Sequence, residues 1–251
     1  MKVVILAGGL GTRLSEETSR IPKPLVKIGK YPILIHIMNI YSFYNHKDFI
    51  ICGGYKYDKI VNFFHNYLDF QLISSKKKVN LFYSKKKKWS VNILFTGNKT
   101  NTGGRLLRIK NNLINEDSFF LTYGDGLSDI NIKNLYNFHK KKEKLITITA
   151  VKPPGRFGVL KIKNTLVSKF QEKVDNKDVW INGGFFVFNK DIFKYLKKDQ
   201  DSLENVALTK MAMRKKIKAY KHEKFWLPMD TLRDKITLNK IWKSGKAPWK
   251  K

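Results

Sequence analysis

Glycines and two cations follow the first apolar segment of the chain. The stretch VVILAGGLGTRLSEETSRIPKP carries Gly8, Gly9, Gly11, Arg13 and Lys23. Because glycine has no Cβ, backbone N–H groups in such a loop can approach phosphate oxygens closely. An arginine guanidinium can donate to two such oxygens at once, and a lysine ammonium adds a point charge. We therefore predict that this stretch holds the phosphates of a nucleoside triphosphate.

The residues of this loop exclude the two commonest phosphate-binding motifs. A dinucleotide-binding fingerprint requires glycine at position 14, where this chain has Leu14. A P-loop ends in Gly-Lys-Ser or Gly-Lys-Thr, whereas this loop ends in Gly11-Thr12-Arg13. The loop must therefore hold phosphate in another way.

Two aspartates are the candidates for a metal site. Asp125 lies in TYGDG, directly after the apolar segment Phe119–Tyr123, and Asp230 lies in PMDT, before the last helical pattern. Open α/β sheets bind ligands at the carboxyl ends of their strands, and the Mg²⁺ that triphosphate chemistry uses prefers carboxylate oxygens. Aspartate is also a favoured N-cap, so the spacing alone leaves a second interpretation open for Asp230.

Apolar periodicity predicts a sheet with helices on both faces. The expected strands are Val3–Ala7, Phe49–Cys52, the hairpin VNLFYS and SVNILFT around Lys85–Lys88, Phe119–Tyr123, and the short runs LITITAV, FGVLKI, LVSKF and GGFFVFN. The expected helices are Pro32–Tyr44, Asp58–Tyr67, one through Leu106, Ile109 and Leu113, and Thr231–Trp242. This alternation indicates a doubly wound, Rossmann-like mixed α/β sheet with a small, mainly antiparallel β extension.

Length and composition limit the class of protein. The 251 residues, 42% of them apolar, predict a single domain with a substantial core, in which His36 is a satisfied core residue. The net charge of +30 would suit a nucleic-acid-binding protein, but it comes from dispersed lysines and few arginines. No apolar run reaches the roughly 18 residues of a membrane span. We therefore expect neither a nucleic-acid nor a membrane partner, and the single cysteine, Cys52, suits the cytoplasm.

Segments along the whole chain resemble the sugar-phosphate nucleotidylyltransferases. In chain order these segments are LAGGLGTRLSEET, PKPLV, TGGRL, TYGDGLSDI, PPGRFGVL, FQEK, INGGFF, FWLPMDTLRDK and GKAPWK. The SEET that follows the arginine is similar to the branch of this family that uses CTP and glucose 1-phosphate. The resemblance implies a fold of the nucleotide-diphospho-sugar transferase type. It also implies a nucleotide-binding half at residues 1–126 and a half for sugar-phosphate binding and assembly at 127–251.

The same resemblance implies the roles of individual residues. The nucleotide-binding residues are Leu6, Ala7, Gly8, Gly9, Leu10, Gly11, Thr12, Arg13, Lys23, Thr100, Arg105 and Gly124. The sugar-phosphate-binding residues are Glu172, Lys173, Asn182 and Gly183, and the Mg²⁺ ligands are Asp125 and Asp230. Catalysis is assigned to Arg13, Lys23, Asp125 and Lys173.

The implied reaction joins CTP and α-D-glucose 1-phosphate to give CDP-glucose and pyrophosphate. Relatives feed deoxysugar synthesis for surface polysaccharide such as O antigen, and they are cytoplasmic homo-oligomers, often hexamers. Three alternatives stay open: UTP or dTTP as the nucleotide, a non-catalytic sugar-nucleotide sensor, and a basic nucleic-acid-binding protein. The chain departs from the family pattern at Phe95, at Val174, and at Leu203 and Ala207, which stand in place of a tryptophan and a proline.

Overall fold

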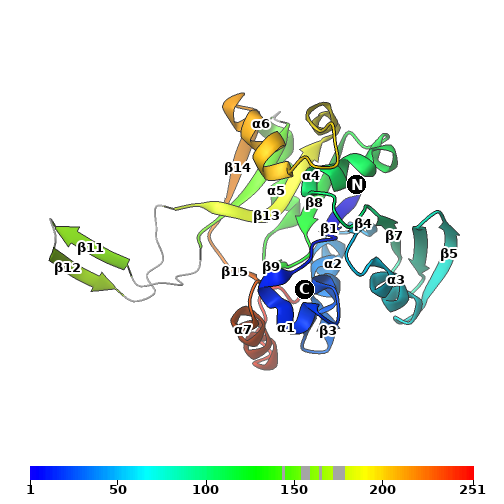
Figure 1. The fold of residues 1–251 in the computed structure, drawn as a ribbon, viewed down its shortest axis with the longest axis horizontal. Helices are drawn as coiled ribbons and strands as arrows, with labels where there is room; N and C mark the ends of the chain where they lie inside the picture. The colour runs from blue at the N-terminus through cyan, green and yellow to red at the C-terminus, as the bar shows by residue number, and fades with distance from the viewer. Residues whose placement is uncertain (143–144, 154–158, 164–165, 172–178) are drawn as a thin grey trace.

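The computed structural model has one large sheet at its centre. It describes the backbone of residues 1–142, 145–153, 159–163, 166–171 and 179–251, and the side chains of 1–141, 145–153 and 179–251. Nine of the described strands form one sheet, in the order β14-β10-β13-β8-β1-β4-β7-β6-β5 (Figure 1). These strands are β1 (Val3–Ala7), β4 (Asp48–Gly53), β5 (Phe70–Lys76), β6 (Val79–Ser84), β7 (Trp89–Phe95), β8 (Ser118–Tyr123), β10 (Ile146–Val151), β13 (Ile181–Asn189) and β14 (Ile217–His222).

The middle of the sheet is parallel and contains a reversal of strand order. β1 pairs in parallel with β4 on one side and with β8 on the other, and β4 pairs in parallel with β7. From β1 the chain moves outward to β4 and β7, and it returns to β8 on the opposite side of β1. Ligands bind where such a reversal occurs, outside the carboxyl ends of the strands. The end of β1 and the end of β8 are therefore the expected place for a site.

Antiparallel pairs extend the parallel centre. β6 and β5 continue the sheet beyond β7, and β13 and β10 continue it beyond β8, each as antiparallel neighbours. Three small ladders stand apart from the large sheet: β2 (Lys27–Ile28) with β3 (Tyr31–Pro32), β9 (Gly126–Ser128) with β15 (Trp226–Pro228), and β11 (Val159–Lys163) with β12 (Leu166–Gln171). The predicted fold class, a mixed sheet with a small antiparallel extension, is confirmed.

Helices cover both faces of the large sheet. The buried residues of α2 (Ile33–Phe43), α3 (Tyr57–His65) and α5 (Ile132–Lys142) belong to the hydrophobic cluster on one face. The opposite cluster contains residues of α4 (Thr102–Arg108), η4 (Lys190–Tyr195), the π-helix η5 (Leu203–Leu208) and α6 (Thr209–Met213). The remaining helical segments are η1 (Thr12–Leu14), α1 (Ser15–Thr18), η2 (Lys23–Leu25), η3 (Lys110–Leu113) and α7 (Leu232–Lys243).

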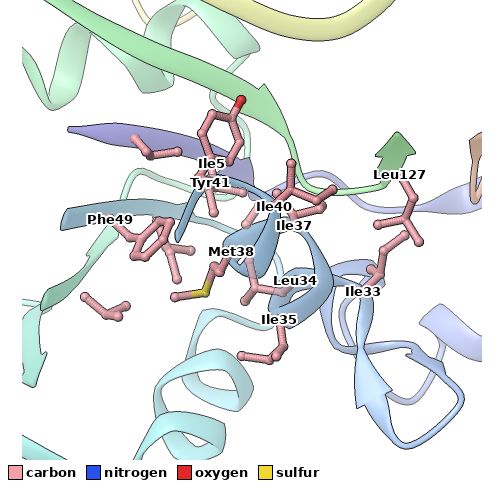
Figure 2. Packing of buried hydrophobic residues seen from close by; sticks show 14 of the residues in the cluster. Ile5, Ile33, Leu34, Ile35, Ile37, Met38, Ile40, Tyr41, Phe49 and Leu127 are labelled. Atoms are coloured by element: carbon pink, nitrogen blue, oxygen red, sulfur yellow. The ribbon is translucent and has the colours of Figure 1, made fainter. Parts of the chain in front are cut away.

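The central strand is buried on both sides, which explains its continuous apolar sequence. Ile5 faces the cluster that contains α2, whereas Val4 faces the cluster that contains α4. Successive side chains of a strand point to opposite faces, so a strand covered on both faces needs apolar residues at every position. Figure 2 shows the buried side chains of α2 gathered with Ile5 of β1, Phe49 of β4 and Leu127 of β9.

One predicted helix differs from the structure, and the predicted terminal helix is confirmed. A single helix through Leu106, Ile109 and Leu113 is wrong, because α4 ends at Arg108 and a separate 3₁₀ turn follows. All three apolar side chains still reach the core, so their spacing cannot reveal the change of helix type. The terminal helix is confirmed as α7. Of its apolar residues, Leu238 is buried and Ile236 is 57% exposed.

Two edge strands were not expected from the sequence. β5 and β14 lie at opposite edges of the large sheet, and most of their side chains are exposed. A strand at an edge does not need the apolar alternation of a strand with one buried face. The sequence therefore carries little signal for either of them.

His36 is buried within an aromatic cluster, as predicted. Its Nε2 lies 2.9 Å from the carbonyl oxygen of Ile28, and Trp249 Nε1 donates to its Nδ1 at 3.3 Å. Because Nδ1 accepts this bond, the ring is neutral with its hydrogen on Nε2. Burial lowers the pKa of His36, and the hydrogen bond to Ile28 raises it only in part.

This lowered pKa predicts a loss of stability in mild acid. Above the unfolded-state pKa of about 6.5, both states are neutral at this residue and its contribution to stability is fully present. As the pH falls from about 6.5 toward the lower folded-state pKa, the unfolded chain binds a proton that the folded chain does not, and the free energy of unfolding decreases. Urea unfolding at pH 7.5 and pH 5.5 should show a smaller loss in His36→Gln than in the unsubstituted protein. Equal losses would contradict this assignment.

Candidate active site

A cavity of about 630 Å³ lies at the carboxyl ends of β1 and β8. Leu6, Ala7 and Gly8 line it at the end of β1, and Thr122 to Gly126 line it at the end of β8. Strand β13 contributes residues 181–185 to the other wall. The cavity therefore lies at the reversal of strand order, and residues from both halves of the sequence line it.

The glycine loop is held from below by a buried arginine of α4. Arg105 is 4% exposed, and its Nη2 donates to the carbonyl oxygen of Gly8 at 2.8 Å. A Cβ on Gly8 would lie 2.2 Å from Arg105 Nη1, so only glycine permits this approach. Nη1 also donates to the carbonyl oxygens of Gly97 at 2.7 Å and Gly53 at 3.3 Å. One guanidinium thus joins the carboxyl ends of β1, β4 and β7.

This guanidinium is buried with carbonyl and hydroxyl oxygens as its hydrogen-bond partners. Its remaining bond goes to the hydroxyl of Thr96 at 2.9 Å. Burial lowers the pKa of Arg105. Cys52 raises this pKa in part, and the positive charge of Arg108 lowers it further. A positive charge therefore lies beneath the glycine loop, beside the cavity where an anionic ligand would bind.

Lys23 lies between the two predicted metal-binding aspartates. Its Nζ is 2.8 Å from Asp125 Oδ2 and 2.8 Å from Asp230 Oδ1. Arg13 Nη1 approaches the other oxygen of Asp230, Oδ2, at 2.8 Å. Burial of the ammonium group lowers the pKa of Lys23, but the charges and hydrogen bonds of the two aspartates raise it overall. The predicted phosphate-binding cations and the predicted metal ligands thus form one charged cluster.

A small ladder brings the two aspartates together across more than 100 positions of sequence. β9 begins directly after Asp125, and β15 ends two residues before Asp230. Gly126 pairs with Pro228 in this ladder, and the backbone N–H of Met229 donates to the carbonyl oxygen of Asp125 at 2.8 Å. Because the strands are antiparallel, the residue before one strand meets the residues after the other.

Asp230 is not the N-cap of α7, so that alternative is wrong. The cap is Thr231, whose hydroxyl accepts from the backbone N–H of Asp234, while Asp234 accepts from the backbone of Thr231 in return. This capping box satisfies the free N–H groups at the start of α7. The side chain of Asp230 consequently points to Arg13 and Lys23.

The structure brings most of the predicted site residues into one place. Every predicted site residue whose side chain is described lines the cavity, except Leu10, which is 56% exposed. Glu172 and Lys173 lie outside the described residues.

Tyr123, Trp226 and Glu204 also belong to this region, although the sequence analysis assigned none of them a role. Tyr123 and Trp226 line the cavity, and Trp226 Nε1 donates to the carbonyl oxygen of Gly183 at 2.7 Å. The hydroxyl of Tyr123 donates to Glu204 and accepts from Asn182 Nδ2 at 3.4 Å. Tyr123 and Trp226 lie within TYGDG and FWLPMD, two of the family-like segments, which is the only signal that could have pointed to them.

Comparison with known proteins decides the family. The model of the family described as nucleotidyl transferase matches residues 2–241. The chain belongs to the nucleotidyl transferase family. The resemblance inferred from the sequence segments is thereby confirmed.

This nucleotidyl transferase has full-length relatives among curated proteins. It is 46% identical over 254 residues to the glucose-1-phosphate cytidylyltransferase of Salmonella typhimurium, covering 100% of this chain and 99% of that protein. The glucose-1-phosphate cytidylyltransferase of Salmonella typhi matches with the same identity and coverage. The crystal structure of HddC from Yersinia pseudotuberculosis shares the fold, with a TM-score of 0.70 at 23% identity over 96% of this chain and 99% of that one. Among the described residues, no helix combines the length and apolar character needed to cross a membrane.

The contacts of Arg105 predict a large effect of a conservative substitution. In Arg105→Lys, one ammonium group cannot reach the acceptors at the ends of three separate strands, and some buried carbonyls lose their donor. We expect a loss of about 2–3 kcal/mol in the free energy of unfolding, measured by urea denaturation. Arg108→Lys is the matched control on the same helix, because its pair with Asp199 is largely exposed and worth less than about 1 kcal/mol. Similar effects of the two substitutions would contradict the role of Arg105.

Proposed function

We propose that this nucleotidyl transferase transfers CMP from CTP to α-D-glucose 1-phosphate and releases pyrophosphate, giving CDP-glucose. The observation that carries the proposal is the cluster of Arg13, Lys23, Asp125 and Asp230 in a cavity at the reversal of strand order. The choice of CTP and of glucose rests on the full-length similarity to the Salmonella cytidylyltransferases.

In this proposal the first wall of the cavity binds the nucleotide. The backbone from Leu6 to Gly9 lies against the cytosine, together with Thr100 and Gly124, and Arg105 supports the loop from beneath. Arg13, whose side chain is 71% exposed, is able to turn from Asp230 toward the β- and γ-phosphates. Lys23 serves the α-phosphate, because its ammonium already lies at the centre of the cluster.

Asp125 and Asp230 fit a divalent cation, which we propose to be Mg²⁺. An oxygen of each carboxylate lies 2.8 Å from the same ammonium nitrogen, so the two carboxylates converge on one position. Within the described residues no group of three His, Cys, Asp or Glu could hold a metal ion. Mg²⁺ commonly binds through one or two carboxylates and completes its coordination with water and substrate phosphates. When bound, such a cation neutralises charge on the phosphate oxygens.

The second wall is proposed to bind the sugar phosphate. Asn182 and Gly183 of β13 line it, and Glu172 and Lys173 are proposed to contact the sugar hydroxyls and the phosphate, respectively. In Asn182, the side-chain oxygen accepts from the backbone N–H of Gly184 at 2.9 Å, which fixes the orientation of the amide.

The chemistry requires positioning more than proton transfer. The second pKa of a phosphate monoester is about 6, so glucose 1-phosphate is largely dianionic at neutral pH. One of its oxygens forms a bond to the α-phosphorus of CTP, and the bond from that phosphorus to the pyrophosphate oxygen breaks. The protein must align two anions that repel one another and stabilise charge as it moves to the leaving group. Arg13, Lys23 and Lys173 are the cations proposed for this work.

The family resemblance supports three further parts of the proposal. We infer a cytoplasmic enzyme, a homo-oligomer that the resemblance makes a hexamer, and a product that enters deoxysugar synthesis for surface polysaccharide such as O antigen. Residues 1–126 would supply the nucleotide side and residues 127–251 the sugar side and the assembly contacts. Sedimentation velocity of the purified protein measures the assembly directly.

The proposed substrates are tested by assaying the purified protein with a set of nucleotides. Pyrophosphate release should be measured with CTP, UTP and dTTP, each with glucose 1-phosphate and Mg²⁺, and the product identified by mass spectrometry. We expect kcat/KM for CTP to exceed the others by about tenfold or more, since contacts to a base edge discriminate strongly. A preference for UTP or dTTP would assign a sister activity, and no release with any nucleotide would favour a non-catalytic protein.

Removing one carboxylate should separate metal binding from folding. Asp125→Asn should abolish the binding of Mn²⁺ in the presence of CTP, measured by electron paramagnetic resonance, and lower kcat by about a hundredfold or more. Asp129→Asn is the control, because Asp129 lies at the other end of β9, with its Oδ1 3.0 Å from His222 Nε2, and does not line the cavity. Retained Mn²⁺ binding in Asp125→Asn would remove this residue from the metal site.

A further inference from the structure

The segment before the π-helix η5 is attached to the start of α4. The backbone N–H of Asn101 donates to the carbonyl oxygen of Asp199 at 2.9 Å, and that of Gly104 donates to Asp201 at 3.0 Å. A Cβ on Gly104 would lie 2.2 Å from the carbonyl oxygen of Asp199, so the backbones touch. This segment therefore satisfies N–H groups at the N-terminus of the helix that carries Arg105.

Glu204, the second residue of η5, forms a hydrogen-bond network with three hydroxyl groups. Its Oε2 accepts from Thr102 at 2.6 Å and from Ser202 at 2.8 Å, and its Oε1 accepts from Tyr123 at 2.5 Å. Burial by itself raises the pKa of Glu204, but the hydrogen bonds, that of Thr102 first, lower it overall. The side chain is thus an ionised acceptor that joins the first turn of α4 to the end of β8.

The network continues from Tyr123 to the sugar side of the cavity. Burial first, and then the charge of Glu204, raise the pKa of Tyr123, so its hydroxyl keeps its hydrogen and donates it to Glu204. The oxygen of that hydroxyl is then left to accept from Asn182 Nδ2 at 3.4 Å. Since Asn182 Oδ1 accepts from Gly184, both ends of this amide are held.

We propose that Glu204 is a positioning residue that acts through Tyr123 to orient Asn182 for the sugar phosphate. Tyr123 and Asn182 line the cavity, whereas Glu204 does not. The inference rests on the proposed function, because it assigns Asn182 to the sugar side. Leu203 and Ala207 of η5, which differ from the family pattern, are both fully buried in the hydrophobic cluster beneath.

A carboxylate is required by the direction of the hydrogen bonds. All three hydroxyl neighbours donate to Glu204, and an ionised carboxylate is an acceptor only. A glutamine has a single acceptor oxygen, so at least one of the three donors loses its partner. If the amide nitrogen faces Tyr123, the hydrogen of that hydroxyl must turn away, toward Asn182 Nδ2, which is itself a donor.

The test compares two substitutions in the network with one beside it. Tyr123→Phe removes the hydroxyl alone, and Glu204→Gln removes the charge with little change in size. We expect each to raise KM for glucose 1-phosphate about five- to tenfold, with kcat and the Kd for CTP changed by less than about twofold. The double variant should resemble the single variants, because both break the same path. Asp199→Asn is the matched control: it weakens attachment of the same segment through Arg108 without touching Tyr123.

The outcomes distinguish this inference from the proposed function and from a merely structural role. An unsubstituted protein that does not use CTP and glucose 1-phosphate would refute the proposed function and with it the inference. An active protein whose KM for the sugar phosphate is unchanged in Tyr123→Phe would refute the inference alone. The inference would also be refuted if Glu204→Gln and Asp199→Asn lost melting temperature, CTP binding and sugar-phosphate binding to the same extent. Such a result would indicate a merely structural role for Glu204. If Glu204→Gln does not fold, Tyr123→Phe decides the question.

Discussion

The structure depends on one ammonium group that keeps two carboxylates side by side. Asp125 and Asp230 each place an oxygen 2.8 Å from the same nitrogen, and two carboxylates this close in a partly buried cavity would repel each other. Lys23 removes this repulsion by contacting both, and Arg13 balances the second charge. The end of β8, the start of α7 and the glycine loop are thus joined by charge at one point, and this joining gives the cavity its shape.

Arg105 is a second buried cation, and it lies beneath the glycine loop. Arg105 joins the ends of three parallel strands through their carbonyl oxygens, and carbonyl oxygens neutralise no charge. Its positive charge, together with Lys23 and Arg13, gives the cavity a field that favours an anionic ligand. A site built for two phosphate-bearing molecules needs this arrangement, because the attraction must be present before the substrates arrive.

The two sides of the cavity are connected through α4. One face of its first turn holds the glycine loop by way of Arg105, and the other holds the segment that presents Glu204 to Tyr123. The glycines of TGGR serve this attachment: Gly104 lets the backbone of residues 199–203 approach the helix. A motif that resembles a ligand-binding sequence therefore also has a packing function, and the sequence alone does not separate the two.

Much of the parallel centre could be predicted, because buried strands carry a strong signal. Val3–Ala7 and Phe119–Tyr123 are apolar at nearly every position, and each is covered on both faces. The edge strands β5 and β14 could not be predicted, since an exposed edge imposes no such pattern. The break between α4 and η3 was missed because Leu106, Ile109 and Leu113 remain buried on either side of it.

The sequence by itself determined the family, the glycine loop, and the residue types able to hold phosphate and a divalent cation. Only the tertiary structure decided that Thr231 caps α7 while Asp230 turns to Lys23, and that Arg105 binds carbonyl oxygens at the ends of three strands. Nor does the sequence indicate that Glu204 contacts Tyr123, since no periodic pattern relates two residues separated by 81 positions. The physical reason is that residue types fix the available chemistry locally, whereas hydrogen-bond partners depend on which distant strand ends the sheet places side by side.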